Sequence, residues 1–339
     1  MKSFIPLICC LLVLVSCGKD KDNGNNNTAP SNLTVNAVVA TDNSGNVSFT
    51  ATATNASTYE FGYGNGIFQT VASGVVTYKY PASGTYTVTV VARSAGGQTI
   101  SKTITVTVTV TLALIWSDEF DTPGAPDPAK WGYDIGAGGW GNNELQYYTN
   151  RLENASVSSG SLKIVLKAES FSGSNYTSAR ILSRGKFSFK YGKVEVRAKL
   201  PAGGGTWPAI WSLGDNFSTV GWPACGEIDI MEHVGNQLNK IFGTLHHPGH
   251  SGGNADGGFT IISNATTEFH KYGMEWSPTS IKFSVDDVVY YSFVNNSTLP
   301  FNQPFFLIMN IAMGGNFGGA VDPAFTTGTM EVDYIRVYQ

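Results

Sequence analysis

Three carboxylates stand close together in residues 226–233, which read Gly-Glu-Ile-Asp-Ile-Met-Glu-His. Their apolar and β-branched neighbours predict a strand inside a folded sheet. Side chains alternate along a strand, so Glu227 and Asp229 share a face, whereas strict alternation turns Glu232 away. A β-bulge near residues 230–231 would return Glu232 to that face. The outer Cα atoms would then lie roughly 13 Å apart, and inward-reaching side chains would bring the carboxyl groups to about 5 Å, as a retaining glycosidase requires.

A structural alternative for these acids is a polar sheet face on which each carboxylate binds a lysine or an arginine. Burying three acids together in an apolar strand costs free energy unless function requires it. We therefore favour a functional site over a solvated acidic face. The chemistry that such a group of acids could perform is acid–base and nucleophilic catalysis.

The composition indicates an extracellular all-β protein. The chain has 339 residues, of which 42% are hydrophobic, 12% aromatic and 14% charged, and it contains 39 glycines. Runs rich in Thr, Val and Ser are typical of strands, and no long amphipathic helix is predicted. The net charge is −4 and no basic cluster is present, which argues against a nucleic acid as partner.

The N-terminus resembles a bacterial export signal. Lys2 precedes an apolar run over residues 5–15 that is too short to span a bilayer. The run ends in Leu-Val-Ser-Cys-Gly at 14–18, which resembles a lipobox. We expect a lipoprotein signal peptide over 1–16 and lipidation of Cys17, with an ordinary secretory signal as the alternative.

This interpretation predicts an exported lipoprotein at the outer membrane, the cell surface or in the periplasm. Residues 17–29 are polar and of low complexity, as a flexible tether is. No later stretch is apolar enough for a membrane helix, so we expect the lipid to be the only anchor.

Residues 30–111 are expected to form a small immunoglobulin-like β-sandwich. Residues 85–91 and 103–108 alternate polar and apolar side chains, and Gly, Asn and Ser clusters separate the runs. Residues 59–66 and 80–88 resemble a PKD-type module, although the aspartates of its usual core are missing. Such modules are mostly spacers, and the alternative is a sugar-binding surface built from Tyr59, Phe61 or Tyr63.

Residues 112–339 are aromatic-rich and glycine-rich and carry repeated candidate strands. Their number and alternation predict two large antiparallel sheets packed face to face, with a cleft on the concave side. The candidate strands are 162–166, 186–189, 193–198, 227–232, 281–285, 305–311 and 330–338.

Several blocks in this half of the chain resemble glycoside hydrolase family 16, in its bacterial laminarinase (endo-1,3-β-glucanase) branch. The likeness runs from about residue 116 to 338. It implies a β-jelly-roll sandwich and cleavage of β-glucans with retention of configuration. Met231 resembles the extra residue of the laminarinase-type motif, which lichenase-type members lack. The blocks are 116–120 (WSDEF), 138–149 (GGWGNNELQYYT), 206–211 (TWPAIW), 221–223 (GWP), 227–232 (EIDIME) and 243–246 (GTLH).

The resemblance implies that Glu227 is the nucleophile and Glu232 the general acid/base. Asp229 would hold Glu227 through a shared proton and help to keep Glu232 protonated. Flat aromatic side chains and planar polar groups suit sugar rings. Each candidate for substrate contact has an alternative role in the core or in holding a loop. These candidates are Asn142, Glu144, Arg180, Trp207, Trp211, Trp222 and His246.

Two groups of residues have types that could bind a metal ion. The cluster at 246–250, His-His-Pro-Gly-His, has a spacing that suggests zinc, but no matching carboxylate or cysteine motif accompanies it, so His247 and His250 are interpreted as loop residues. The family resemblance implies a structural calcium ion on the convex side, held by Glu119, the Gly160 carbonyl and Asp333. The alternative is that these acids are merely exposed.

The prediction is an endo-acting, retaining β-1,3-glucanase that needs no cofactor for catalysis and is a monomer. Its partner would be a β-glucan polysaccharide or oligosaccharide. Alternatives are a mixed-linkage β-1,3-1,4-glucanase, a galactanase of the agarase or carrageenase type, and a transglycosylase. A non-catalytic β-glucan-binding protein is the alternative from a different class, although such relatives have usually lost a catalytic glutamate. Cys225 is expected to be a small buried residue.

Overall fold

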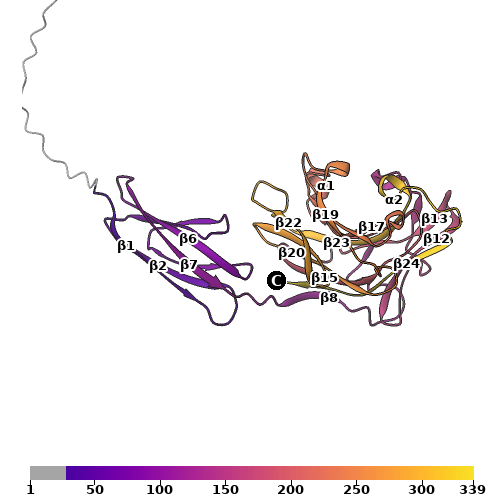
Figure 1. The fold of residues 1–339 in the computed structure, drawn as a ribbon, viewed down its shortest axis with the longest axis horizontal. Coiled ribbons are helices and arrows are strands. Elements are labelled where there is room, and N and C mark those ends of the chain that lie inside the picture. Colours follow the sequence, from indigo (N-terminus) through magenta and orange to yellow (C-terminus); the bar gives the residue numbers. More distant parts are fainter. Residues whose placement is uncertain (1–27) are drawn as a thin grey trace, which may run out of the picture.

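The computed structural model describes residues 28–339. The predicted signal peptide and Cys17 lie outside the described residues. The strands form two separate groups, joined by a short connection (Figure 1). The backbone of Thr111 still hydrogen-bonds to the first group, at Asn43, whereas Ala113 pairs with Gln339 of the second. Within the described part of the chain, no helix has the length and apolar character needed to cross a bilayer.

The first group is a sandwich of two antiparallel sheets around its own core. Alternating β-branched residues form its longest strands, and their apolar faces meet over Phe49 and Phe61. Phe61 and Tyr63 are fully buried, so they belong to this core and are not free to bind sugar. The strands are β1 (Ser31–Val39), β2 (Asn46–Thr54) and β5 (Val75–Lys79) in one sheet, and β4 (Phe68–Val71), β3 (Thr58–Gly62), β6 (Gly84–Arg93) and β7 (Thr99–Val108) in the other.

The second group contains a ten-stranded sheet, which is antiparallel except where β10 and β13 pair in parallel. Its long strands alternate buried and partly exposed residues, as expected for a sheet with one face on a core. The strands are β10 (Gln146–Tyr148), β13 (Ser174–Ser178), β12 (Ser161–Phe171), β24 (Thr327–Tyr338), β15 (Gly192–Lys199), β20 (His270–Trp276), β21 (Ser280–Val285), β22 (Val288–Val294), β11 (Ala155–Ser158) and β8 (Leu114–Asp118).

The facing sheet has seven antiparallel strands and carries the acidic segment. The inner strand β23 is buried along its whole length, and β16 and β17 are buried at all but two and one of their positions, respectively. In sheet order the strands are β19 (Asp256–Ile261), β18 (Lys240–His246), β17 (Glu227–His233), β16 (Thr206–Gly214), β23 (Phe305–Met313), β14 (Arg180–Leu182) and β9 (Gly132–Asp134).

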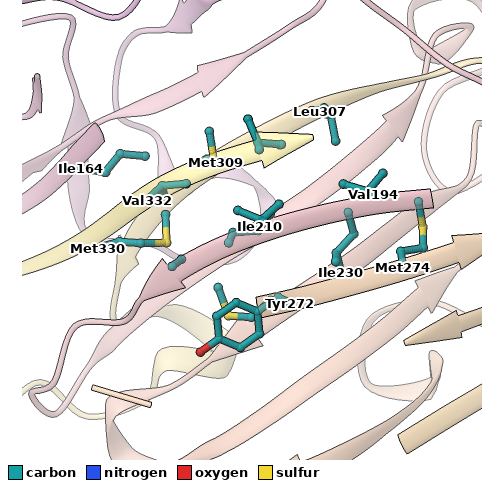
Figure 2. Packing of buried hydrophobic residues seen from close by; sticks show 14 of the residues in the cluster. Ile164, Val194, Ile210, Ile230, Tyr272, Met274, Leu307, Met309, Met330 and Val332 are labelled. Atoms are coloured by element: carbon teal, nitrogen blue, oxygen red, sulfur yellow. The ribbon is translucent and has the colours of Figure 1, made fainter. Parts of the chain in front are cut away.

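A large apolar core fills the space between these two sheets. Ile210, Ile230 and Leu307 project from the seven-stranded sheet, and Val194 and Met274 project from the ten-stranded sheet (Figure 2). All five side chains are almost completely buried. This packing fixes which face of each strand looks away from the core, and therefore where polar side chains of the same strands must lie.

Helices are short and confined to connections. The all-β prediction is confirmed, but the strand predicted at 186–189 is wrong: that segment is a turn held by Ser183, with one isolated bridge between Phe189 and Phe305. The helical turns are α1 (Phe217–Val220), α2 (Gly315–Gly318), η1 (Gly139–Gly141), η2 (Gly235–Gln237) and η3 (Gly252–Asn254).

Candidate active site

Strand β17 carries the predicted β-bulge. Its register against β16 shifts between Ile210, which pairs with Met231, and Trp211, which pairs with Asp229. Ile230 is therefore the extra residue, and the register against β18 shifts over the same place. The bulge prediction is confirmed, and it lets two consecutive apolar side chains enter the core without turning the third acid inwards.

The side chains of β17 divide cleanly between the two faces of the sheet. Ile228, Ile230 and Met231 belong to the core between the sheets. Glu227 and Glu232 instead contact polar groups on the opposite face, through indole donors from neighbouring segments. The bulge thus places both outer acids on the face that points away from the core.

Glu232 accepts a hydrogen bond on each carboxyl oxygen. Trp207 Nε1 donates to Oε1 at 3.0 Å, and Thr244 Oγ1 donates to Oε2 at 2.8 Å. Burial raises the pKa of Glu232, and the two hydrogen bonds oppose that rise. A raised pKa keeps the carboxyl protonated closer to neutral pH, which is the property a general acid needs.

Glu227 is the first residue of β17, and its carboxyl group contacts an exposed tryptophan. Trp222 Nε1 donates to Glu227 Oε2 at 3.0 Å, and His246 Nε2 lies 3.6 Å from Oε1. Burial, followed by the charge of Asp229, raises the pKa of Glu227 to about 8, while His246 acts in the opposite direction. Trp222 is 44% exposed, so its indole is free to stack on a ligand as well as to hold the carboxyl group.

Asp229 lies between the two glutamates and is almost fully buried. His246 Nε2 is 3.2 Å from its Oδ2. Burial and the nearby charge of Glu232 raise the pKa of Asp229 well above its ordinary value. Since burial raises the pKa of all three acids, the group holds fewer than three negative charges near neutral pH.

The orientation of His246 is set by the loop that follows β18. The backbone N–H of Gly252 donates to His246 Nδ1 at 3.1 Å. Nδ1 is therefore the acceptor, and the neutral ring carries its proton on Nε2, directed at Asp229 and Glu227. This imidazole N–H complements a cluster of buried carboxyl groups.

A second polar network lies beside the acids and contains four of the predicted contact residues. Arg180 Nε is 2.9 Å from Asp134 Oδ2, and its guanidinium lies over the ring of Trp211, 4.7 Å from the centroid. Trp211 Nε1 donates to Asn310 Oδ1 at 2.8 Å. The network continues through Asn310 and Tyr148 to Glu144, which also accepts from Gln146 and Asn142.

Glu144 is the central acceptor of this network, and burial raises its pKa. A pocket of about 280 Å³ borders it, lined also by Gly138, Leu145 and Tyr176. The structure thus brings the predicted residues Asn142, Glu144, Arg180 and Trp211 into one network. Sequence reasoning missed Tyr148 and Asn310, because nothing in a single apolar strand marks a buried asparagine as a link between a tryptophan and a tyrosine.

On the other side of Glu232 the sheet face becomes apolar. We use the name aromatic shelf for the side chains that form this part of the face: Trp207, Phe317, Phe242, Phe259 and Lys240. The ring of Phe317 contacts those of Trp207 and Phe242 edge-on, with centroids 5.5 and 5.1 Å away. Phe259 pairs with Phe242 across β18 and β19, is 56% exposed, and has Lys240 Nζ 4.0 Å above its ring. Along β18, Lys240, Phe242, Thr244 and His246 alternate with buried residues. This period-2 pattern was the sequence signal that would have predicted Lys240 and Phe242 on the same face as the acids.

The two carboxylates among the three predicted calcium donors are paired with arginines. Both oxygens of Glu119 accept from Arg336, at 3.0 and 2.7 Å, and Asp333 Oδ2 accepts from Arg197 at 2.6 Å. Carboxylate and carbonyl oxygens suit a hard cation, but an ion at this place would have to compete with both guanidinium groups. Calcium stays a prediction, and no catalytic step depends on it.

Cys225 matches its prediction as a small buried residue. The side chain is fully buried and is a free thiol. Burial, followed by the charge of Glu227, raises the pKa of the thiol to about 11. A protonated, inaccessible thiol is unsuited to act as a nucleophile.

Comparisons with known proteins agree with this geometry. The model of the family "Glycosyl hydrolases family 16" matches residues 142–336, and that of "Beta-glucan synthesis-associated protein SKN1/KRE6/Sbg1" matches residues 43–228. A beta-glucanase from Rhodothermus marinus is 50% identical over 242 residues, which cover 67% of this chain and 85% of the relative.

Solved structures of similar proteins share the fold of the second group of sheets. The laminarinase from Rhodothermus marinus aligns with a TM-score of 0.65 at 50% identity, covering 68% of this chain and 98% of its own. LamA from Z. galactanivorans, in complex with laminaritriose and laminaritetraose, aligns with a TM-score of 0.62 at 45% identity, covering 67% of this chain and 99% of its own. The predicted β-jelly-roll sandwich is confirmed by this likeness. The chain is a glycosidase and belongs to the glycosyl hydrolases of family 16.

Proposed function

We propose that the protein is an endo-acting, retaining hydrolase of β-1,3-glucan that works by double displacement. The observation that carries the proposal is the bulged strand β17, which presents Glu227 and Glu232 on one sheet face with an indole donor to each. The names of the similar proteins, a beta-glucanase and laminarinases, support a β-1,3-glucan as the substrate. The oligosaccharides bound to one of them support it further.

In the first step, Glu232 donates its proton to the glycosidic oxygen while the carboxylate of Glu227 attacks the anomeric carbon. The bond to the leaving sugar breaks, and a covalent glycosyl-enzyme forms. In the second step, Glu232 takes a proton from water, which attacks the same carbon and releases Glu227. Two inversions at one carbon retain its configuration.

Asp229 has a defined part in this scheme. With a pKa of about 8, Glu227 must lose its proton before it attacks, and Asp229, whose pKa is also raised by burial, is the neighbouring acceptor. We propose that the two carboxyl groups share one proton, which lies on Asp229 when Glu227 attacks. The Nε2–H of His246 and the indole N–H of Trp222 stabilise the ionised Glu227.

The substrate would lie along the sheet face across the acids. The exposed indole of Trp222 and the partly exposed indoles of Trp207 and Trp211 offer flat surfaces to sugar rings. The planar polar groups of the Glu144 network are suited to hydroxyl groups; they belong to Asn142, Glu144 and Arg180. Removing the polar group of Asn142, Glu144 or Arg180 should act mainly on KM, because none of the three reaches the reacting carbon in this scheme, whereas Trp207 and Trp222 also hold the catalytic carboxyl groups.

The direct test is reducing-sugar release from laminarin by the purified full chain, with lichenan and agarose as competing substrates. We expect release from laminarin to be fastest. Glu227→Gln and Glu232→Gln should each lower kcat by at least about 10²-fold while folding normally, because each removes one of the two catalytic groups. Fastest release from agarose would favour a galactanase, and binding without release would favour a glucan-binding protein. If either variant keeps most of its activity, the assignment of roles is wrong.

We further propose that the protein is exported, that a lipid on Cys17 is its only membrane anchor, and that it is a monomer. The support comes from the sequence: a short apolar run followed by a lipobox-like segment. The Cys17→Ala variant should move from the membrane fraction to the soluble fraction of the expressing cells. Unchanged membrane association would contradict the lipid anchor.

Calcium binding by Glu119, the Gly160 carbonyl and Asp333 is proposed from the family resemblance. The ion would have to displace Arg336 and Arg197 from the two carboxylates. If it does, a chelator should lower the melting temperature of the wild type and leave Glu119→Gln unchanged. If the chelator leaves the melting temperature of the wild type unchanged, the calcium proposal is wrong, and Arg336 and Arg197 bind these acids instead.

A further inference from the structure

The loop between β18 and β19 begins with a turn that holds two histidines side by side. His247 and His250 flank Pro248 and Gly249, and Gly249 has a φ of +83°. A type II turn requires positive φ at the third position, which favours glycine, and commonly has proline at the second. The backbones of the two histidines exchange hydrogen bonds of 2.8 and 2.9 Å, and their rings stack with centroids 4.7 Å apart.

A carboxylate from the far end of the same loop reaches both imidazoles. Asp256, the first residue of β19, has its Oδ2 2.9 Å from His247 Nε2 and 3.1 Å from His250 Nδ1. Strand pairing between Asp256 and Leu245 fixes its position. The side chain of His247 is buried, whereas that of His250 is 50% exposed, so the cluster has one open side. This carboxylate is the ligand that the sequence motif lacked.

The three ligand atoms are spaced much as zinc requires. Tetrahedral zinc with bonds of about 2.0–2.1 Å places its ligand atoms about 3.3 Å apart. Two separations here are 2.9 and 3.1 Å, and all three atoms lie within 4.8 Å of one another. We propose that His247, His250 and Asp256 bind a zinc ion, with water as a fourth ligand on the open side. To admit the ion, the two short separations would lengthen by a few tenths of an ångström and the two imidazole nitrogens, which lie within 4.8 Å of each other, would take the same spacing.

The site would act on the loop that orients His246 and not on the substrate. Residues 247–255 include Gly252, whose N–H holds His246 Nδ1 at 3.1 Å and thereby aims Nε2 at Asp229. An ion that ties His250 to Asp256 closes this loop at both ends. We expect zinc to stabilise the loop and to leave the Glu227–Glu232 chemistry itself intact, so the inference does not depend on the proposed substrate.

The experiment is titration of the chelator-treated full chain with zinc chloride, followed by calorimetry. We expect one ion per chain. His250→Ala and Asp256→Asn should each weaken binding by more than about 100-fold, beyond the 10–100-fold that loss of an outer partner costs. The control is His270→Ala, because His270 pairs with Asp286 at 2.7 Å without a second imidazole. Its binding should equal that of the wild type. Cobalt should report the same site through the visible absorption of a four-coordinate ion.

A second measurement separates a metal site from a simple hydrogen-bonded clamp. At a free zinc concentration 100 times Kd, the melting temperature of the wild type should rise by about 5–10 °C, and that of His250→Ala should not. The proposal is overturned if the wild type shows no zinc binding, if His250→Ala binds as tightly as the wild type, or if His270→Ala loses binding to the same extent. In those cases Asp256 is only a clamp between two histidines.

Discussion

Burial raises the pKa of Glu227, Asp229 and Glu232 alike, but their hydrogen-bond partners differ. Glu232 has two neutral donors, Trp207 and Thr244, whereas Glu227 has one indole donor and a nearby imidazole. Asp229 faces only His246 among the donors within reach in the described residues. In the proposed scheme, burial favours the proton that Glu232 donates, and the imidazole and indole N–H groups beside Glu227 stabilise its ionised form during attack.

The charge of Asp229 is the second cause, after burial, of the raised pKa of Glu227. Asp229→Asn removes that charge, so we predict that the pKa of Glu227 falls and that the acidic limb of the pH profile of kcat/KM moves to lower pH. The measurement is the pH profile on laminarin, compared with Asp287→Asn, an exposed aspartate outside the site. An acidic limb that stays in place, or moves to higher pH, would contradict the proposed coupling.

The bulge in β17 is the element on which the site depends. Its existence was predictable, because three acids and three apolar residues cannot be sorted onto opposite faces by strict alternation. Its position was also predictable to within a residue, since Ile230 and Met231 are adjacent and both are buried. The partners of the acids were only partly predictable, because Thr244 and Asn310 come from strands paired by tertiary contacts that no local pattern reports.

Two deletions test the alternation argument. Removing Met231 leaves Glu-Ile-Asp-Ile-Glu, in which ordinary alternation keeps all three acids on one face. We expect a folded protein whose kcat falls by about 10²-fold, the cost of a displacement of about 1 Å. Removing both Ile230 and Met231 turns the last glutamate into the core and should abolish hydrolysis. Equal activities of the two deletions, measured on laminarin, would show that the bulge is not what places Glu232.

The aromatic shelf leads from Glu232 to the edge strand β19. Phe259 is 56% exposed at the end of that shelf, where a sugar ring could cover it. We predict that Phe259→Ala raises KM for long laminarin chains by about 2- to 10-fold, from a loss of about 0.5–1.5 kcal/mol of stacking, with little change in kcat. Phe68→Ala, at a position that is 69% exposed on the first sandwich, is the control and should have no effect. An equal rise in KM for both variants would mean that the aromatic shelf does not bind the substrate.

At the scale of the whole molecule, the fold class and the two sandwiches followed from composition and period-2 patterns. The segment 186–189 was misjudged because its alternation of Phe and polar residues is that of a strand, whereas a turn bonded to Ser183 orders it. Sequence patterns did not connect His247 and His250 with Asp256, because this carboxylate lies six residues beyond the motif and reaches the histidines only through strand pairing. Local patterns predicted elements, and contacts between elements decided the sites.

The acidic cluster should reduce the stability of the protein at neutral and alkaline pH. The folded pKa of Glu227, about 8, exceeds its ordinary value of 4.5, so the stability linked to its proton is present below about pH 4.5 and is lost as the pH rises towards 8. We predict that Glu227→Gln melts several degrees above the wild type at pH 8, at about 2–4 °C per kcal/mol, and at nearly the same temperature at pH 4. Calorimetric melting at both pH values checks this. A wild type that is equally or more stable at pH 8 would contradict the raised pKa.

The most direct test of the double-displacement account is the configuration of the first product. Proton NMR of laminarin during its first minutes of hydrolysis distinguishes the two anomers at the new reducing end before they interconvert. Because Glu227 and Glu232 are placed to act in two successive inversions at one carbon, the β-anomer should appear first and the α-anomer only later by mutarotation. Initial release of the α-anomer would mean a single inversion and would contradict the role proposed for Glu227.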